Sequence, residues 1–264
     1  NAERGLFGAL GTDSKVSNLT IKGKSTGGGA VTGYANGSNV VIENCVSYVE
    51  INGTTNNVGG IVGYANSKAV IKNCANHGNA AGAGSVGGII GGFVGSSVTI
   101  TDCYNTGNVT ATGSKAGGIF GSSGYGITVN NCYNKGEVKG ASLAGGIGGE
   151  AKGETHWSTG AVLSATTVSN CYNVGKADKA AFGSVDAGSA TVENCYYLDT
   201  LGKDANAEAL AEIDMKSAPM GDGFKLVCKD YPALKWQTDV TEHSASGDGT
   251  VVAPTCTAKG YTEY

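Results

Sequence analysis

The sequence predicts an all-β protein, a parallel β-helix (β-solenoid) of about seven coils of ~29 residues with a C-terminal cap of helix and strand. Two recurring phrases predict this fold. Cysteines stand at 45, 74, 103 and 132, at intervals of 29 residues, and each closes a β-branched run that ends in Asn or Asp. Between them, Gly-Gly-x-x-Gly recurs at 59–63, 87–91, 117–121 and 145–149. A fixed period of this kind is typical of stacked repeats, which bury their apolar faces against one another.

The composition excludes several classes of protein. Glycine accounts for 45 of 264 residues, but it follows the 29-residue period and not a period of three, which excludes collagen. The net charge of -4 and the single arginine, Arg4, argue against a nucleic-acid partner, which needs a basic surface. No apolar run reaches the ~18 residues of a membrane span. We therefore expect a monomer without nucleic acid and without a membrane span.

Each repeat begins with a strand that ends at a corner. In Val98–Thr101, Val98 and Ile100 would face one side and the two threonines the other, as in a half-buried strand. The next residue interrupts this alternation, and Asn or Asp suits a sharp turn because both tolerate left-handed backbone geometry. We expect these corner residues to stack as a ladder along the solenoid: Asn44, Asn73, Asp102, Asn131, Asn170 and Asn194.

The cysteines form the second expected ladder, with each thiol turned inward after its corner. Stacking in register would place them ~4.8 Å apart and parallel, whereas a disulfide needs side chains that face each other. No two cysteines have the close spacing of a zinc site. We expect buried free thiols, no metal and no cofactor, with the ladder made of Cys45, Cys74, Cys103, Cys132, Cys171 and Cys195. Cys228 and Cys256 lie outside it, and the sequence indicates no partner for either.

The chain divides into three predicted parts. Residues 1–204 hold the solenoid, whose first coil is degenerate because Asn18-Leu19 replaces Asn-Cys. Residues 205–237 form the C-terminal cap, with a helix over 205–216 and two strand-like segments, which we expect to cover the unpaired strand edges at the end of the solenoid. Residues 238–264 have strand and turn signals without room for a core, and we interpret them as the truncated start of a following surface module.

An insertion marks the first candidate binding site. Cys132 and Cys171 are 39 residues apart, and the ten extra residues lie within 150–161. Insertions in repeat proteins become loops on one face, which is often the binding face. We expect Glu154, His156 and Trp157 of this loop to contact a ligand. The alternative is that the charged and polar residues of the insertion belong to an ordinary solvated loop.

A row of tyrosines marks the second candidate. The residue after the cysteine is Tyr in four coils, preceded by Val46 and Ala75 in earlier coils, and the strand geometry predicts that it points outward. An exposed aromatic row would suit sugar rings or a protein partner. The alternative is that the stacked rings only stabilise adjacent coils. The row consists of Tyr104, Tyr133, Tyr172 and Tyr196.

The phrases Gly-Leu-Phe-Gly at 5–8, Gly-Gly-Ile-x-Gly and Asn-Cys-Tyr-Asn-x-Gly together resemble GLUG-motif repeats. Such repeats occur in large secreted and cell-surface proteins of bacteria, including non-catalytic regions of IgA-protease-like proteins and surface proteins of gut Firmicutes. The resemblance covers roughly 5–237 and supplies no catalytic residues. It implies an extracellular location, secreted or on the bacterial cell surface. It also implies a role in adhesion, in recognition of a glycan or a host-matrix or surface protein, or as a stalk.

The alternative is a β-helix polysaccharide lyase or glycoside hydrolase that uses the 150–161 insertion, with Glu150, Glu154 and His156 as its site. Glycoside hydrolysis needs two carboxylates ~5–9.5 Å apart across one bond. The acidic residues are scattered, and residues 51–101 contain none. We therefore expect no catalytic residues and favour the binding protein over the enzyme.

Overall fold

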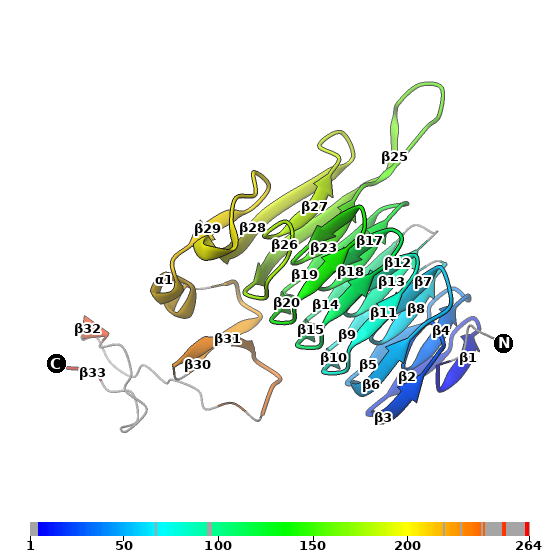
Figure 1. Ribbon diagram of the computed structural model, residues 1–264, viewed down its shortest axis with the longest axis horizontal. Coiled ribbons are helices and arrows are strands. Elements are labelled where there is room, and N and C mark those ends of the chain that lie inside the picture. The colour runs from blue at the N-terminus through cyan, green and yellow to red at the C-terminus, as the bar shows by residue number, and fades with distance from the viewer. Residues whose placement is uncertain are drawn as a thin grey trace.

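The computed structural model describes residues 5–66, 68–93, 97–218, 220–227, 229–238 and 240, together with the backbone of residues 250–251 and 262–263. The predicted fold is confirmed, because parallel sheets build a β-solenoid (Figure 1). It has about five full turns. Our count of about seven included the first and last coils, which are incomplete: seven strands line one sheet but four line another.

The first sheet contains one strand from each coil, and its strands pair in parallel with their neighbours along the solenoid. Ile90, for example, lies between Val62 of the preceding coil and Phe120 of the next. Its strands are β1 (Phe7–Leu10), β4 (Thr32–Ala35), β8 (Val62–Ala65), β13 (Ile90–Phe93), β18 (Phe120–Ser123), β23 (Gly148–Ala151) and β27 (Phe182–Val185).

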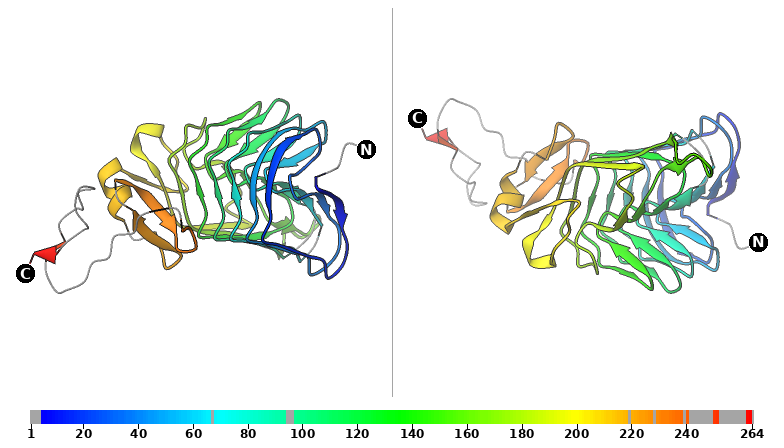
Figure 2. Two further views of the ribbon diagram at one scale, coloured as in Figure 1. Left: turned by 90° about the horizontal axis from the view of Figure 1, so that it is seen from below. Right: turned by 90° about the horizontal axis from the view of Figure 1, so that it is seen from above.

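The coils stack side by side along the axis of the solenoid (Figure 2). The second sheet carries the Asn corner. The strands that lead into the corner are β2 (Lys15–Ser17), β5 (Val41–Glu43), β9 (Val70–Lys72), β14 (Val98–Thr101) and β19 (Ile127–Asn130), together with β26 (Thr166–Asn173) and β28 (Ala190–Leu198), which continue through it. The strands beyond the corner are β3 (Thr20–Ser25), β6 (Val46–Asn52), β10 (Ala75–Asn76), β15 (Tyr104–Asn105), β20 (Tyr133–Asn134) and β29 (Glu208–Leu210), followed in three coils by β11 (Ala80–Gly82), β16 (Val109–Ala111) and β21 (Val138–Gly140).

The third sheet and several small elements complete the fold. The third sheet consists of β7 (Asn57–Gly59), β12 (Ser85–Gly87), β17 (Lys115–Gly117) and β22 (Leu143–Gly145). The remaining elements are β24 (Glu154–Thr155), β25 (Val162–Ser164), η1 (Asp199–Leu201), α1 (Glu212–Ser217), β30 (Phe224–Val227), β31 (Asp230–Leu234), β32 (Thr250–Val251) and β33 (Thr262–Glu263).

The six predicted corner residues share a left-handed backbone, with φ between 49° and 53°. Their side chains bond along the solenoid: Asn73 Nδ2 donates to Asn44 Oδ1 (3.1 Å), and Asn131 Nδ2 donates to Asp102 Oδ1 (3.0 Å). The ladder is interrupted between Asn73 and Asp102, because a carboxylate has no amide hydrogen to donate. The six cysteines follow these corners as buried free thiols, as predicted. Cys228 and Cys256 lie outside the described residues.

A second asparagine ladder runs inside the solenoid, and we did not predict it. It consists of the fully buried Asn76, Asn105, Asn134 and Asn173, each of which donates from Nδ2 to the carbonyl oxygen of the glycine two residues later at 2.7–2.8 Å. Nδ2 of each of the first three also donates to Oδ1 of the next member at 2.8 Å. Asn76 Oδ1, at the start of the ladder, has no partner, because the preceding coil carries Ser47 at this register.

The Gly-Gly phrase makes room for this buried ladder. A Cβ on Gly88 would lie 2.4 Å from Cγ of Asn105, and one on Gly118 would lie 2.4 Å from Cγ of Asn134. The phrase follows Val86 of one hydrophobic cluster and precedes Ile89 of another. The contact between asparagine and glycine therefore crosses the interior between two apolar cores, and it couples the two repeating phrases of the sequence.

The C-terminal end of the solenoid is covered by residues 199–210. Asp204 Oδ2 accepts hydrogen bonds from the N–H groups of Ala181 (3.0 Å) and Phe182 (2.7 Å). One coil earlier, the carbonyl oxygen of Ala181 accepts the equivalent bonds from Ile147 and Gly148. The carboxylate of Asp204 therefore takes the place of the carbonyl that a further coil would supply.

The C-terminal cap differs from the prediction in its secondary structure and in its position. The helix expected over 205–216 is wrong in extent, since 208–210 form β29 and only Glu212–Ser217 are helical. Met215 is buried, whereas Ile213 is exposed. We call residues 211–237 the cover, because α1, β30 and β31 lie along the tyrosine side of the second sheet as well as beside its end (Figure 1). The predicted module at 238–264 lies almost entirely outside the described residues.

Candidate functional site

Three tyrosines of the predicted row form one continuous stack. The ring centroids of Tyr104 and Tyr133 lie 4.9 Å apart with planes 5° from parallel, and Tyr133 and Tyr172 lie 4.9 Å apart at 2°. This spacing follows from in-register parallel pairing, which places equivalent side chains one strand separation apart.

The cover packs its apolar side chains on this stack. Phe224 lies against the rings of Tyr133 and Tyr172, and Trp236 against that of Tyr104. The same hydrophobic cluster includes Met215, Met220 and Leu234. As a result Tyr104, Tyr133 and Tyr172 are at most 5% exposed.

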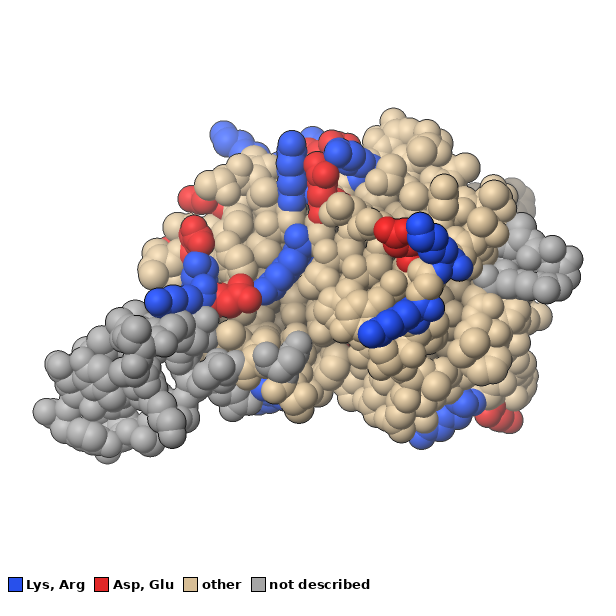
Figure 3. Space-filling model, turned by 60° about the horizontal axis from the view of Figure 1, so that its bottom comes forward, with Lys and Arg blue, Asp and Glu red and all other residues tan. Residues whose placement is uncertain are grey.

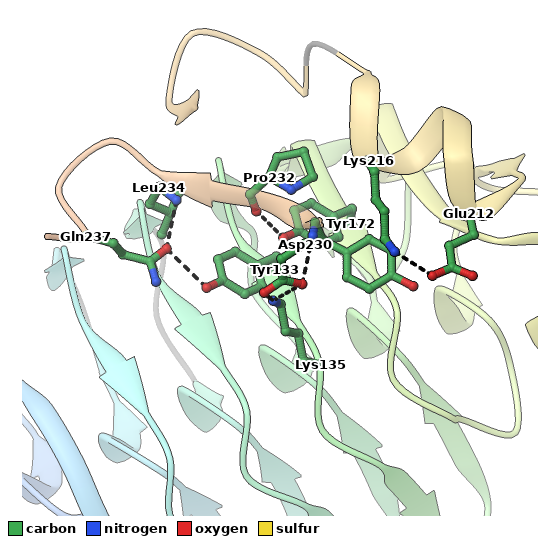
Figure 4. A network of polar contacts seen from close by, with 10 residues as sticks. Tyr133, Lys135, Tyr172, Glu212, Lys216, Asp230, Pro232, Leu234 and Gln237 are labelled. Carbon is green, nitrogen blue, oxygen red and sulfur yellow. Dashed lines mark hydrogen bonds and ion pairs between the residues drawn. The ribbon is translucent and has the colours of Figure 1, made fainter. Parts of the chain in front are cut away.

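Polar contacts fasten the cover to the stack (Figure 4). The Tyr133 hydroxyl donates to Gln237 Oε1 at 3.0 Å, and the Tyr172 hydroxyl donates to the carbonyl oxygen of Pro232. Lys135 Nζ pairs with Asp230 at 2.8 Å. Burial raises the pKa of Tyr172 well above its ordinary value, so its hydroxyl keeps the proton that it donates.

The expectation that this row is exposed is therefore wrong for three of its four members. The rings point outward from the coils, but the cover shields Tyr104, Tyr133 and Tyr172 from solvent. Only Tyr196, on β28 of the last coil, is half-buried. The stack joins coils to each other and to the cover, in agreement with the structural alternative.

His77 belongs to the same side of the solenoid. Its half-buried ring stacks on Tyr48 at 4.7 Å and meets Tyr104 edge-on. Its Nδ1 lies 2.8 Å from Thr106 Oγ1. His243 lies outside the described residues.

The predicted loop at 150–161 is a projecting antiparallel hairpin made by β24 and β25 (Figure 1). Its base is fixed to the solenoid: the N–H of Gly153 donates to Ser189 Oγ at 2.9 Å, and Thr166 Oγ1 donates to the carbonyl oxygen of Lys152 at 2.7 Å. Its turn is closed by bonds between the backbones of His156 and Ala161 (2.7 Å) and of Gly160 and His156 (2.9 Å). The hairpin is therefore fixed at its base and projects from the coil before the last one.

The tip of this hairpin is apolar and exposed. Trp157 is 92% exposed, Leu163 58% and Val162 46%. Residues 155–164 contain no Lys, Arg, Asp or Glu. His156 lies beside the indole with ring centroids 6.1 Å apart, and its Nδ1 contacts Ser158 Oγ at 3.2 Å. An exposed tryptophan on a fixed, uncharged tip is typical of a recognition surface, since the indole offers a large rigid contact area.

The acidic residues of the insertion have separate environments. Glu150 lies on the first sheet, where its Oε2 accepts hydrogen bonds from Lys115 Nζ (2.5 Å) and Ser122 Oγ (3.0 Å). Glu154 is half-buried at the base of the hairpin, where its backbone pairs with Ser164. Within the described part of the chain, no group of three or more His, Cys, Asp or Glu side chains could hold a metal ion.

A groove opens at the C-terminal end of the solenoid. It measures about 290 Å³ and lies between Val192, Asn194 and Cys195 of β28 and the segment 205–208. Sequence reasoning missed it, because it depends on where the chain returns after the last coil. No signal in the repeats marks that return.

These observations define the class of protein: a parallel β-solenoid with a fixed apolar hairpin and a C-terminal cover. On the face drawn in Figure 3, acidic and basic side chains lie in small mixed groups separated by uncharged surface. No helix among the described residues has the length and apolarity needed to cross a membrane. Comparison of the chain with protein-family models, with curated proteins and with solved structures finds no match.

Proposed function

We propose that this chain is a non-catalytic recognition module of a bacterial cell-surface or secreted protein, and that it binds a glycan or a host surface protein through the hairpin 154–164. The observation that carries the proposal is the 92% exposure of Trp157 on a tip whose base is bonded to the solenoid. Solvation of so large an apolar side chain is unfavourable, and contact with a ligand would relieve it.

The chemistry of the tip favours a ligand with apolar faces. An indole ring stacks on the C–H face of a sugar or fills an apolar pocket of a protein, while the nearby hydroxyl of Ser158 and the ring of His156 offer hydrogen bonds. The absence of charge between residues 155 and 164 argues against a ligand held by ion pairs. The solenoid then serves to hold the hairpin away from its point of attachment.

The resemblance to GLUG-motif repeats supports the extracellular location and the adhesive role that we propose. The enzyme alternative has less support, because Glu150 is engaged by Lys115 and Ser122 on the first sheet. A general acid needs a carboxyl group that is available to the scissile bond.

The test is a binding screen of the full 264-residue chain against a glycan array and a panel of matrix proteins. We expect Trp157→Ala to abolish binding to any ligand found while leaving the melting temperature unchanged, since the side chain makes few contacts with the fold. Ile213→Ala is the matched control, because Ile213 is 67% exposed but lies on α1.

Three results would contradict the proposal in different ways. Full retention of binding by Trp157→Ala would remove the hairpin from recognition. Turnover of a polysaccharide would favour the enzyme. Absence of binding across the whole panel would favour a stalk.

A further inference from the structure

Only the second half of the last coil is followed by a further paired strand. The strand β29 pairs with only the second half of β28, where Tyr196, Tyr197 and Leu198 face Glu208, Ala209 and Leu210. The preceding residue, Ala207, packs against the end of the core. Residues 207–210 thus supply what a further coil would place after the Asn corner. No strand in the described ranges supplies what it would place before that corner.

The hydrogen bonds that join the corner residues of successive coils end at this open edge. In five earlier coils the N–H of the corner residue donates to a carbonyl oxygen of the next coil at 3.1–3.2 Å; the donors are Asn18, Asn44, Asn73, Asp102 and Asn131. In four coils the side-chain Oδ1 of the corner also accepts from an Asn one coil later. Asn194 is the corner of the last coil and lines the groove. No described coil follows it to accept from its N–H or to donate to its Oδ1 as in the earlier coils.

The sequence register defines what would fit on this edge. Residues in line with Val192 are apolar in every coil: Val16, Ile42, Ile71, Ile100, Val129 and Val168. In line with Glu193 stand the polar residues Ser17, Glu43, Lys72, Thr101, Asn130 and Ser169. The acid among them, Glu43, forms an ion pair of 3.0 Å with Lys72 of the next coil. In line with Asn194 stand the other corner residues, all of them Asn except Asp102.

We propose that the edge formed by residues 190–194 of β28 binds a partner polypeptide as one extended, parallel strand with the pattern apolar residue, basic residue, asparagine. The apolar side chain would cover Val192, the basic one would pair with the exposed Glu193, and the asparagine would extend the corner ladder from Asn194. This is β-strand addition, in which backbone bonds give affinity and alternate side chains give specificity. Glu208, which lines the groove, adds a second negative charge that favours a basic strand.

The occupant is a single strand and not a second copy docked end to end. In the first coil of a second copy, β3 follows β2 after only two residues. If β2 of that copy paired with residues 190–194, its β3 would fall where β29 already pairs with residues 196–198. A flexible segment of about five residues meets no such obstacle.

A peptide with the sequence of residues 68–73, Lys-Ala-Val-Ile-Lys-Asn, carries this pattern. We expect it, labelled with fluorescein and amidated, to bind the full chain saturably in a fluorescence anisotropy titration. Binding should increase the protection of the Asn194 amide from hydrogen exchange, because that N–H gains an acceptor.

Charge reversal provides the decisive comparison. Glu193→Lys should weaken the peptide by about tenfold, as expected when a cross-strand attraction becomes a repulsion. The peptide Lys-Ala-Val-Ile-Glu-Asn should recover the lost affinity on that variant. Glu50→Lys is the matched control, because Glu50 is an exposed acid on β6, away from this edge. It should bind the first peptide as the unmodified chain does.

Three results would overturn the proposal. The first is absence of saturable binding at peptide concentrations on the order of 1 mM. The second is equal affinity for both peptides in the chain with and without Glu193→Lys. The third is concentration-dependent self-association in sedimentation that Glu193→Lys abolishes, which would make a second copy the occupant. None of these results depends on the hairpin at Trp157.

Discussion

Replacing Asn134 with alanine should cause one of the largest losses of stability available to a single polar residue of this chain. Asn134 is fully buried and makes four hydrogen bonds. Its Nδ2 donates to the carbonyl of Gly136 and to Oδ1 of Asn173, both at 2.8 Å. Its Oδ1 accepts from Asn105 Nδ2 at 2.8 Å and from the N–H of Gly136 at 3.1 Å.

The magnitude follows from the groups left behind. Asn105 Nδ2 keeps its bond to Gly107, and Asn173 Oδ1 keeps its bond from Gly175. The N–H and C=O of the buried Gly136 lose the Asn134 side chain, and each unsatisfied buried group costs ~1–3 kcal/mol. We expect a loss of roughly 3–5 kcal/mol in total, or a fall in melting temperature of about 10 °C for a chain of this size.

Calorimetric melting of three variants checks this reasoning. Asn131→Ala, at the half-buried corner, should lose about 1–2 kcal/mol, mainly because alanine disfavours the left-handed backbone at φ 52°. Asn52→Ala, on the exposed face of β6, should change little. A melting temperature for Asn134→Ala equal to that of Asn52→Ala would refute the buried ladder.

Three further predictions follow from the ends and faces of the solenoid. Asp204→Ala should lower the free energy of unfolding in urea by roughly 2–4 kcal/mol, because the N–H groups of Ala181 and Phe182 lose their acceptor. The control Asp199→Ala, in η1, should lower it little. Equal effects of the two variants would contradict the capping role of Asp204. Denatured protein should show at least six free thiols in a colorimetric titration. In native protein the six ladder thiols should not react, because all six are buried and the reagent cannot reach them; fewer than six after denaturation would contradict the ladder. Hydrogen bonds from Lys15 and Lys72 lower the pKa of Glu43 below its ordinary 4.5. The unmodified chain should therefore be more stable than Glu43→Gln above that pH, and this advantage should disappear as the pH falls through the lower folded-state pKa. A difference in melting temperature between the two proteins that stays constant between about pH 2 and pH 7 would count against it.

The repeat register was predictable from the sequence because it is a local property. A β-branched alternation ending at Asn44, Asn73 or Asn131 specifies a strand and a left-handed corner, and the 29-residue interval specifies the stacking. The buried ladder could also have been found, since Asn105 and Asn134 are each followed two residues later by glycine and each precedes a Gly-Gly phrase. Its signal was present in the phrase Tyr-Asn-x-Gly, but we assigned significance only to the tyrosine.

The position of the cover was not predictable in this way. Whether Tyr133 is exposed depends on Phe224 and Gln237, which lie about a hundred residues further along the chain and carry no repeat. An outward-pointing tyrosine looks the same in sequence with or without a neighbour above it. For the hairpin, the change of spacing located the insertion near Trp157, but its antiparallel pairing depends on contacts at its base with Ser189, which belongs to the next coil.

The cover has a consequence for how such a solenoid can grow. Repeat proteins lengthen when a unit is duplicated, and an ordinary solenoid accepts a new coil at any point along its axis. Here Tyr104, Tyr133 and Tyr172 must remain in adjacent coils, because Trp236, Gln237 and Pro232 each meet one of them at a fixed place. A duplicated coil between Cys103 and Cys171 would separate these partners, whereas one placed before Cys74 would leave them together. The cover therefore divides the solenoid into a segment of fixed length and an N-terminal segment whose length is free to change.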